Sequence, residues 1–210
     1  MEKIRIMPKY KTIVIDPPWP IVKDALQSIK KSNYEKHPPT LNYNTISEEW
    51  LLNFPIDDFA ADESMIFLWV TGGVTTRSYP IIRLGFDMLD KWGFTFRALL
   101  YWSKKNVGMS KPYLPYRMTV EPIIFATRKI SQVPPYGKYS DLFEAPRRRH
   151  SEKPCEFYQA LREWTPKPRI DIFARRAHVG FDGWGFEYVG EGPLSKYIYA
   201  EEGPFEELLE

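Results

Sequence analysis

Residues 12–19, TIVIDPPW, decide the fold of this chain. The first four are β-branched and the run is apolar on both faces, which predicts a strand buried on both sides, as in an α/β sheet. The two prolines carry no N–H group and fix φ, so the strand must end at Asp16. An acid therefore stands at the end of the strand. It is followed by two residues that offer a carbonyl group but no N–H, and then by the large flat ring of Trp19. A plain strand that ends in a proline-rich turn is the blander interpretation of the same residues.

Further apolar runs, separated by helix-like stretches, extend this pattern along the chain. The expected helices begin at good start signals, such as Ser47 before two acids and Pro154 before an amphipathic run. Strands that alternate with helices predict an α/β fold, namely a Rossmann-like, doubly wound, mostly parallel sheet with helices on both faces. We expect strands at 13–16, 65–70, 96–102, 122–127 and 170–173, helices at 47–52, 75–91 and 154–164, one domain over 1–190, and a peripheral acidic tail over 191–210.

Two segments do not fit the expected sheet. Residues 22–46 follow DPPW directly and are polar, and residues 103–120 mix lysine, arginine, tyrosine, glycine and proline. Long irregular segments at the carboxyl ends of strands are usually functional, and in open α/β sheets that edge binds the ligands. We therefore expect both segments to lie beside a ligand site.

Composition limits the class of protein. The 210 residues are enough for one α/β domain, and a hydrophobic fraction of 43% argues against disorder. The single cysteine, Cys155, excludes a disulfide within the chain and a cysteine-based zinc site. We see no apolar signal-peptide core near the N-terminus and no uncharged apolar run long enough to cross a membrane. These features predict a cytoplasmic protein that is not associated with a membrane.

The residues Asp16, Pro17, Pro18 and Trp19 suit one kind of chemistry, the transfer of a methyl group to a planar amine. The lone pair of an exocyclic amine is delocalised into the ring, so its nitrogen is a poor nucleophile. The Asp16 carboxylate and the Pro17 carbonyl can each accept one N–H, which favours a tetrahedral nitrogen whose lone pair points at an electrophile. Trp19 can stack on the base, which must first be flipped out of a duplex. A sulfonium methyl held in line would be the electrophile, and no metal is required.

Several motifs match a known family in order. After DPPW come YNTIS (43–47), FLWVT (67–71), Glu121 with IFATR (124–128), HSEKP (150–154), IDIFAR (170–175) and GFDGWG (180–185). Together they resemble the MT-A family of S-adenosylmethionine-dependent methyltransferases that modify adenine N6, which includes the catalytic subunit of the eukaryotic messenger-RNA adenosine methyltransferase. The resemblance covers residues 10–190 and implies a class I methyltransferase fold with a permuted motif order.

The resemblance implies S-adenosylmethionine as the cofactor. Lys153 precedes a helix N-terminus, where an anion is favoured, and would grip the methionine carboxylate. Asp171 and Arg175 resemble the ribose-binding residues of related folds, and His178 would lie near the ribose or the methionine end. The chain departs from the family by one extra residue before His178 and by Phe186 in place of an asparagine. The expected cofactor-binding residues are Asp16, Lys153, Asp171, Arg175, His178 and Glu187.

Basic clusters adjoin the expected ligand edge, although the net charge is only +2. Short lysine and arginine runs are often merely solvated surface, but these lie next to the ligand loops and suit phosphate contacts at the rim of a pocket. By resemblance, Tyr43 belongs to a gate loop over the base. The expected substrate-binding residues are Trp19, Tyr43, Lys104, Lys105, Arg117, Arg147, Arg148 and Arg149.

The leading interpretation is an adenine-N6 methyltransferase that acts on nucleic acid. DNA is favoured over RNA because a compact member looks more like the prokaryotic or phage-type enzymes, and an RNA adenosine methyltransferase is the nearest alternative. A non-catalytic nucleic-acid-binding subunit is another, although such subunits typically lack the acid-Pro-Pro set that is intact here. A methyltransferase for cytosine or protein glutamine is a third. Because family members pair, a homodimer or a complex with a related partner subunit is a further expectation.

Overall fold

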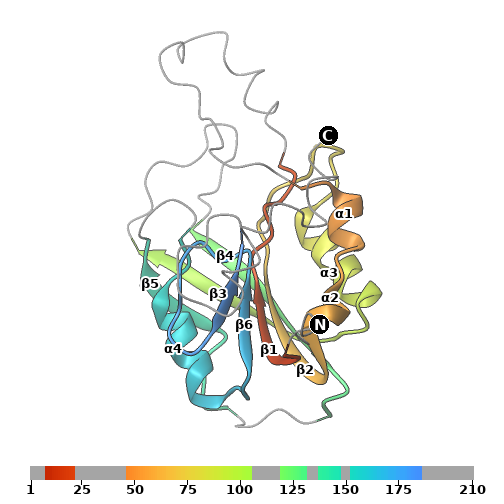
Figure 1. Ribbon diagram of the computed structural model, residues 1–210. Coiled ribbons are helices and arrows are strands. Elements are labelled where there is room, and N and C mark those ends of the chain that lie inside the picture. Colours follow the sequence, from red (N-terminus) through yellow and green to blue (C-terminus); the bar gives the residue numbers. More distant parts are fainter. Residues whose placement is uncertain (1–7, 22–45, 106–118, 132–136, 148–151, 186–210) are drawn as a thin grey trace, which may run out of the picture.

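The computed structural model describes residues 8–21, 46–105, 119–131, 137–147 and 152–185. These residues form a mixed α/β structure, a seven-stranded sheet with short helices (Figure 1). The strand order is β5-β3-β4-β2-β1-β6-β7. The strands are β1 (Tyr10–Ile15), β2 (Ala60–Trp69), β3 (Thr95–Lys105), β4 (Val120–Arg128), β5 (Leu142–Pro146), β6 (Arg169–Ile172) and β7 (Asp182–Trp184).

The sheet is mostly parallel, as predicted, with one reversed strand. β1 pairs in parallel with β2 and β6, β6 with β7, and β3 with β5. β4 runs antiparallel to both of its neighbours, β2 and β3. This reversal brings the beginning of β4 to the edge at which the other strands end. Residues that open β4 therefore lie near residues that follow the other strands.

β1 lies inside the sheet and is buried on both faces, which confirms the prediction from its apolar run. Ile13 and Ile15 pack into one hydrophobic cluster, and Val14 packs into a second cluster on the opposite face. All three are fully buried. Because side chains alternate along a strand, each face of the sheet has its own core.

Helices cover both faces of the sheet (Figure 1). Three of them share the cluster of Ile13 and Ile15, and the fourth packs on the face of Val14. Two begin where the sequence predicts, at Ser47 and Pro154, and the Ser47 hydroxyl accepts a hydrogen bond from the N–H of Trp50. The first three helices are α1 (Glu48–Leu52), α2 (Ile56–Phe59) and α3 (Ile81–Lys91), and the fourth is α4 (Cys155–Trp164).

The helix predicted over 75–91 is wrong in its first part, because α3 begins only at Ile81. Before it, the hydroxyl of Thr75 accepts hydrogen bonds from the N–H groups of Arg77 and Tyr79. A side chain that takes over backbone donors competes with helical hydrogen bonding. The apolar spacing therefore predicted that a helix is present in this segment but did not predict the residue at which it begins.

Two strands were not predicted from the sequence. β5 lies at one edge of the sheet and is largely exposed, and β7 has three residues at the other edge. Neither contains the long apolar run that marks the inner strands. Part of the segment 103–120 was expected outside the sheet but belongs to it, since residues 103–105 end β3 and residue 120 begins β4. Residues 106–118 of that segment, most of 22–46, and the tail 191–210 lie outside the described residues.

The order of strands changes direction between β1 and β6. From β1 the chain adds strands on the side of β2, and after α4 it returns to add β6 and β7 on the other side. In open α/β sheets such a switch point opens a crevice outside the carboxyl ends of the strands, where ligands bind. The topology therefore places a ligand site at the ends of β1 and β6, where DPPW begins.

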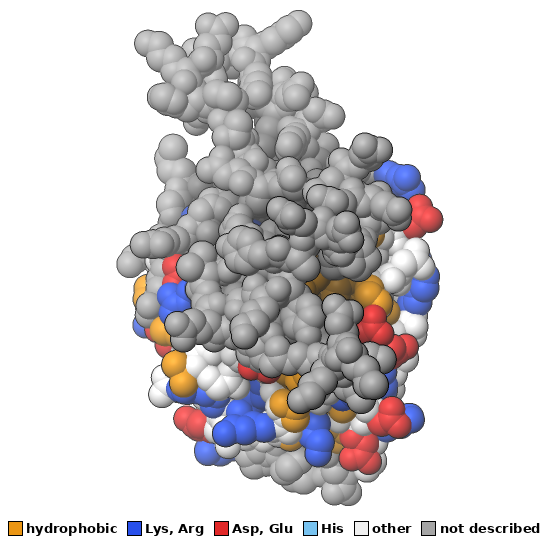
Figure 2. All heavy atoms as spheres, viewed as in Figure 1, with side chains coloured by type: hydrophobic (Ala, Val, Ile, Leu, Met, Phe, Trp, Pro, Cys, Tyr) orange, Lys and Arg blue, Asp and Glu red, His pale blue; other side chains and the backbone are white. Residues whose placement is uncertain are grey.

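The described surface is mixed in charge. On the face shown in Figure 2, basic and acidic side chains lie interspersed among apolar ones wherever the structure describes the surface. Among the described residues, no helix is long and apolar enough to cross a membrane. A polyanion would therefore meet short basic patches, and not one continuous basic field, on the described part of this face.

Candidate active site

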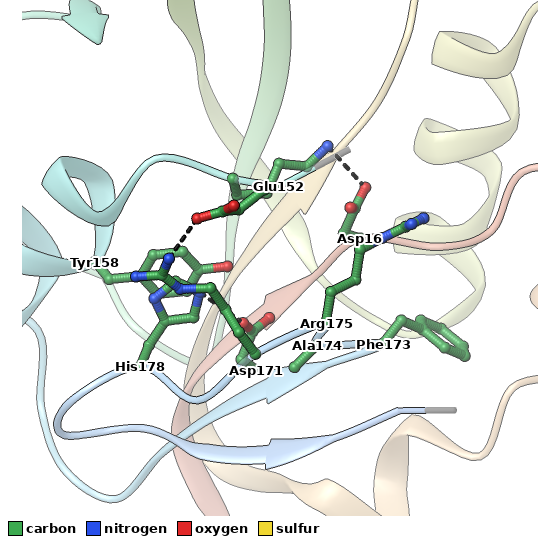
Figure 3. A pocket seen from close by; sticks show the side chains of 10 residues that line it. Asp16, Glu152, Tyr158, Asp171, Phe173, Ala174, Arg175 and His178 are labelled. Carbon is green, nitrogen blue, oxygen red and sulfur yellow. Dashed lines mark hydrogen bonds and ion pairs between the residues drawn. The ribbon is translucent and has the colours of Figure 1, made fainter. Parts of the chain in front are cut away.

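Asp16 stands where the topology places the site. Its N–H donates to the carbonyl of Ile172 (3.2 Å), so the residue extends the pairing of β1 with β6. Its carboxylate is largely buried, with 14% of the side chain exposed. It lines a pocket together with residues from the end of β6 and from the segment before α4 (Figure 3). Backbone pairing on a central strand thus fixes the acid of DPPW at the crevice.

The prolines and Trp19 form a tight turn after Asp16. The carbonyl of Pro17 accepts the N–H of Trp19 (2.8 Å), and the indole N–H of Trp19 donates to the carbonyl of Trp69 (3.2 Å). Only 5% of Trp19 is exposed. The ring therefore anchors the turn to the end of β2, while its stacking on a base stays a prediction. A carbonyl has two lone pairs, so that of Pro17 can accept a second hydrogen bond.

A chain of alternating charges extends from Asp16. The ammonium of Lys153 lies 3.1 Å from Asp16 Oδ1 and 3.1 Å from Glu121 Oε2. Glu121 Oε1 in turn lies 2.5 Å from the ammonium of Lys104. All four side chains are between 12 and 23% exposed. Two carboxylates and two ammonium groups balance one another, which is how proteins accommodate buried charges. We call these four residues the charge chain.

Burial and pairing oppose each other in the charge chain. Burial raises the pKa of Asp16 against the attraction of Lys153, and the charge of Glu121 raises it further. Burial also acts to raise the pKa of Glu121, but Lys153 and Lys104 together lower it. Burial acts to lower the pKa of Lys153, but its two carboxylate partners raise it. Of the two carboxyl groups, Asp16 is the one that the site shifts toward the protonated form.

The chain turns sharply after β6, beside the pocket. Phe173 has a positive φ of 62°, which a bulky residue rarely adopts and which often marks functional sites. The N–H of Ala174 donates to the carbonyl of Trp184 (3.0 Å). A Cβ added at Gly185 would meet the backbone oxygen of Ala174 at 2.6 Å. Glycine is required there because the residue after β7 packs directly on this turn.

The two arginines after the turn face acids across the pocket. Arg175 reaches toward Asp16 (Figure 3), and its charge opposes the burial that raises the pKa of Asp16. Arg176 forms an ion pair with Glu152, the residue before Lys153. The segment before α4 is thus tied both to the end of β1 and to the turn after β6.

α4 contributes an aromatic ring to the same pocket. Tyr158 stacks on His178, with ring centroids 3.4 Å apart and planes 10° apart (Figure 3). Burial and hydrogen bonding to Asp171 raise the pKa of the Tyr158 hydroxyl. Burial, aided by the charge of Arg176, lowers the pKa of His178 to about 4. The 3.8 Å contact between His178 Nε2 and Asp171 Oδ2 is therefore made by a neutral ring and is not an ion pair.

Asp171 itself carries an unusual acceptor. The residue is buried, and burial raises its pKa well above the ordinary carboxyl range. Its Oδ1 atom has no hydrogen-bond partner among the described residues. A buried acceptor without a partner costs about 1–3 kcal/mol, so a native structure that keeps one calls for an explanation such as a ligand.

The structure gathers most of the expected cofactor-binding residues. Asp16, Lys153, Asp171, Arg175 and His178 line one pocket although they are far apart in the sequence. The sixth, Glu187, lies outside the described residues. These residues come together because β1 pairs with β6 and because the segment before α4 packs against the ends of both strands.

The expected substrate-binding residues are more scattered. Lys104 was expected at the phosphate rim, but its ammonium turns inward to Glu121, with 16% of the side chain exposed. Lys105 is more than half exposed and pairs with Glu144 (3.0 Å), and Arg147 is also exposed. Four of the eight, Tyr43, Arg117, Arg148 and Arg149, lie outside the described residues.

Four residues of this arrangement were not predicted as site residues, although two left a signal in the sequence. Glu121 is an acid directly before a proline and beside an apolar run, and both features are shared with Asp16. Tyr158 lies on the apolar face of α4, where a buried hydroxyl requires a partner. The other two, Glu152 and Arg176, pair with each other across the pocket, and a sequence does not show that their segments lie side by side. The four are Glu121, Glu152, Tyr158 and Arg176.

Comparison with known proteins agrees with this geometry. The MT-A70 family matches residues 10–187. The chain is 26% identical over 191 residues to the type II methyltransferase M.MunI of Mycoplasma sp, which covers 85% of this chain and 78% of that protein. It is 27% identical to the N6-methyladenosine RNA methyltransferase MTA1 of Pyricularia oryzae and to the N(6)-adenine-specific methyltransferase METTL4 of Mus musculus. The latter two alignments cover 92% of this chain but only 51% and 41% of those proteins.

The matched region contains every described element of the sheet and the whole pocket at the switch point. The motifs that carried the resemblance therefore lie within it, from DPPW to the glycine-containing turn after β6. The chain belongs to the MT-A70 family of S-adenosylmethionine-dependent N6-adenine methyltransferases.

Proposed function

We propose that the protein methylates the exocyclic amine of adenine in DNA, with S-adenosylmethionine as the donor. The observation that carries the proposal is the position of Asp16, a buried carboxylate at the switch point, followed by two residues that carry no N–H. Support for DNA over RNA comes from how much of each relative the alignment covers. The chain spans 78% of the type II methyltransferase M.MunI but 51% of the RNA methyltransferase MTA1.

The pocket has the donors and acceptors that S-adenosylmethionine requires. That cofactor carries a carboxylate, an ammonium group and ribose hydroxyls. Lys153 and Arg175 offer positive charge to the carboxylate, and an ammonium has three donors, of which Asp16 and Glu121 take two. The free Oδ1 of Asp171 offers an acceptor to an amine or a hydroxyl. We therefore assign Lys153, Asp171, Arg175 and His178 to the cofactor.

The proposed mechanism divides the work among the residues of DPPW. Bound S-adenosylmethionine supplies an electrophilic sulfonium methyl group. Asp16 accepts one N–H of the adenine amine, and the second lone pair of the Pro17 carbonyl accepts the other. Trp19 fixes the turn to β2 and so holds both acceptors in place. Lys153 stabilises the charged form of Asp16, which is the stronger hydrogen-bond acceptor.

The order of motifs supports a permuted class I methyltransferase fold on a single domain. The strand that carries DPPW, β1, comes first in the described chain, and β6 with its cofactor turn comes after five other strands. Both nevertheless pair side by side inside the sheet, between β2 and β7. The fold thus joins an early catalytic segment to a late cofactor segment.

The test uses the purified protein, isotope-labelled S-adenosylmethionine, and matched duplex DNA, single-stranded DNA and RNA. Each product is digested to nucleosides, and the methylated one is identified by mass. We expect N6-methyladenine in DNA. If N6-methyladenine is found in RNA alone, the substrate is RNA and the proposal of DNA is wrong. No label in any polymer, together with normal cofactor binding, would favour a non-catalytic subunit or a requirement for a partner.

A further inference from the structure

We infer that Tyr158 is a positioning residue that holds Asp171 and His178 in the arrangement that binds the cofactor. This inference rests on the proposed role of Asp171 and His178 toward S-adenosylmethionine. It adds a residue from α4 that contacts both of these side chains and whose ring helps to line the pocket.

The ring of Tyr158 fixes the orientation of His178. The two rings are stacked in nearly parallel planes at van der Waals distance, with centroids 3.4 Å apart. Tyr158 is 3% exposed and His178 is 8% exposed, so neither ring has room to turn away. On its other side Tyr158 packs edge-on against Phe157 and Phe181, at 5.5 and 5.3 Å between centroids. The orientation of His178 is therefore set by the packing of α4 on the sheet.

The hydroxyl of Tyr158 stabilises the ionised form of Asp171. Burial raises the pKa of Asp171, and the hydrogen bond from Tyr158 acts against that rise. When this bond occupies one side of the carboxyl group, the unpartnered Oδ1 atom is left for a donor of the cofactor. The titratable groups that face Asp171 are Tyr158 on α4, Lys153 before α4, Asp16 after β1 and His178 after β6.

The segment from Lys153 to Tyr158 thus reaches both halves of the pocket. At its beginning, Lys153 pairs with Asp16 at the end of β1. Five residues later, in the first turn of α4, Tyr158 contacts Asp171 on β6 and His178 after it. Because both contacts come from one short segment that leads into α4, this segment helps the sheet to fix the distance between Asp16 and Asp171.

Calorimetric binding of S-adenosylhomocysteine to the full chain tests the inference without a nucleic-acid substrate. Tyr158→Phe keeps the stacked ring and removes the hydroxyl. We expect about tenfold weaker binding near neutral pH, the lower end for a lost hydrogen bond to a charged group. Because Asp171 then ionises at higher pH, the pH at which binding reaches its plateau should also move upward. A purely structural defect would weaken binding without moving that pH.

Tyr10→Phe is the matched control. Tyr10 is fully buried and its hydroxyl donates to Asp182 (2.9 Å), but Tyr10 stands at the amino end of β1 and neither residue lines the pocket. We expect wild-type affinity in Tyr10→Phe. Equal affinity of Tyr158→Phe and wild type at every pH would overturn the inference and leave the proposed function standing, as would equal weakening in both variants. No binding to the wild-type chain would overturn the cofactor assignment itself.

Discussion

Replacing Glu121 by glutamine removes one negative charge from the charge chain and nearly preserves its shape. Behind the larger effect of burial, that charge raises the pKa of Asp16. Its loss therefore lowers the pKa of Asp16, and Lys153 is left with Asp16 as its charged partner, which acts in the same direction. In the proposed mechanism the ionised carboxylate of Asp16 is the stronger acceptor for the amine, so activity should rise as the pH rises through its pKa. We expect the acid limb of the pH–rate profile to move to lower pH in Glu121→Gln.

The size of the shift follows from the distances. Each carboxylate lies 3.1 Å from the same ammonium, so the two lie within about 6 Å of each other, where like charges repel by about 0.7 kcal/mol in water and about 3 kcal/mol at an effective dielectric constant of 20. A change of about 1.4 kcal/mol moves a titration by one pH unit. Since both side chains are largely buried, we expect the acid limb to move by about one unit.

The assay measures initial rates at saturating cofactor and nucleic acid across the acid range. Glu144→Gln is the matched control, because Glu144 pairs with Lys105 at 3.0 Å and both side chains are more than half exposed. Such surface pairs contribute about 0–1 kcal/mol. We expect the profile of Glu144→Gln to match that of the wild type.

Two outcomes would refute the reasoning. An acid limb that stays in place in Glu121→Gln would mean that Glu121 does not act on the group that limits the rate. A limb that moves equally in Glu144→Gln would mean that net charge, and not the buried contact through Lys153, sets its position.

Three further predictions concern Asp16, Gly185 and His178. Asp16→Ala should abolish methyl transfer and leave cofactor binding partly intact, as measured by the isotope assay and by calorimetry, and unchanged turnover would exclude the proposed mechanism. Gly185→Ala places a Cβ 2.6 Å from the backbone oxygen of Ala174 and should lower the free energy of unfolding in urea by about 1–3 kcal/mol. Gly73→Ala, whose Cβ would meet its nearest neighbour at 3.5 Å, should change that energy little, and equal losses would contradict the close packing at Gly185. His178 has a folded pKa of about 4 against 6.5 when unfolded, so its contribution to stability is complete above pH 6.5 and is lost as the pH falls toward 4. That contribution is about 3 kcal/mol, and a His178→Gln variant with the same acid dependence of unfolding as the wild type would contradict it.

Local signals in the sequence were sufficient for the central strand and two helices. The β-branched run before Asp16 predicted a strand buried on both faces, because such a run leaves no polar side for solvent. The serine before α1 and the proline before α4 predicted where those helices begin. The position of the pocket at the end of β1 also followed, since prolines terminate the strand at the edge where α/β sheets bind ligands.

The charge chain required information that the sequence does not display. Glu121 joins the site only because β4 runs opposite to the other strands, and strand direction leaves no local trace in a single sequence. The same reversal and the pairing of β3 with β4 bring Lys104 to Glu121, which is why a residue expected at the phosphate rim lies inside. Tyr158 likewise depends on which strand α4 covers, and edge strands such as β5, with five residues, are too short to be recognised by hydrophobic pattern.

The position of β1 inside the sheet also affects how the chain folds while it is being synthesised. It is the first described strand to leave the ribosome, but its neighbour β6 begins only at Arg169. One edge of β1, apolar on both faces, therefore stays unpaired until most of the chain has emerged. An open apolar edge readily pairs with another chain, and incomplete chains are prone to aggregate for that reason. A ribosome that stalls before β6 would release a product that lacks the crevice between β1 and β6 and also exposes the strand that leads to Asp16.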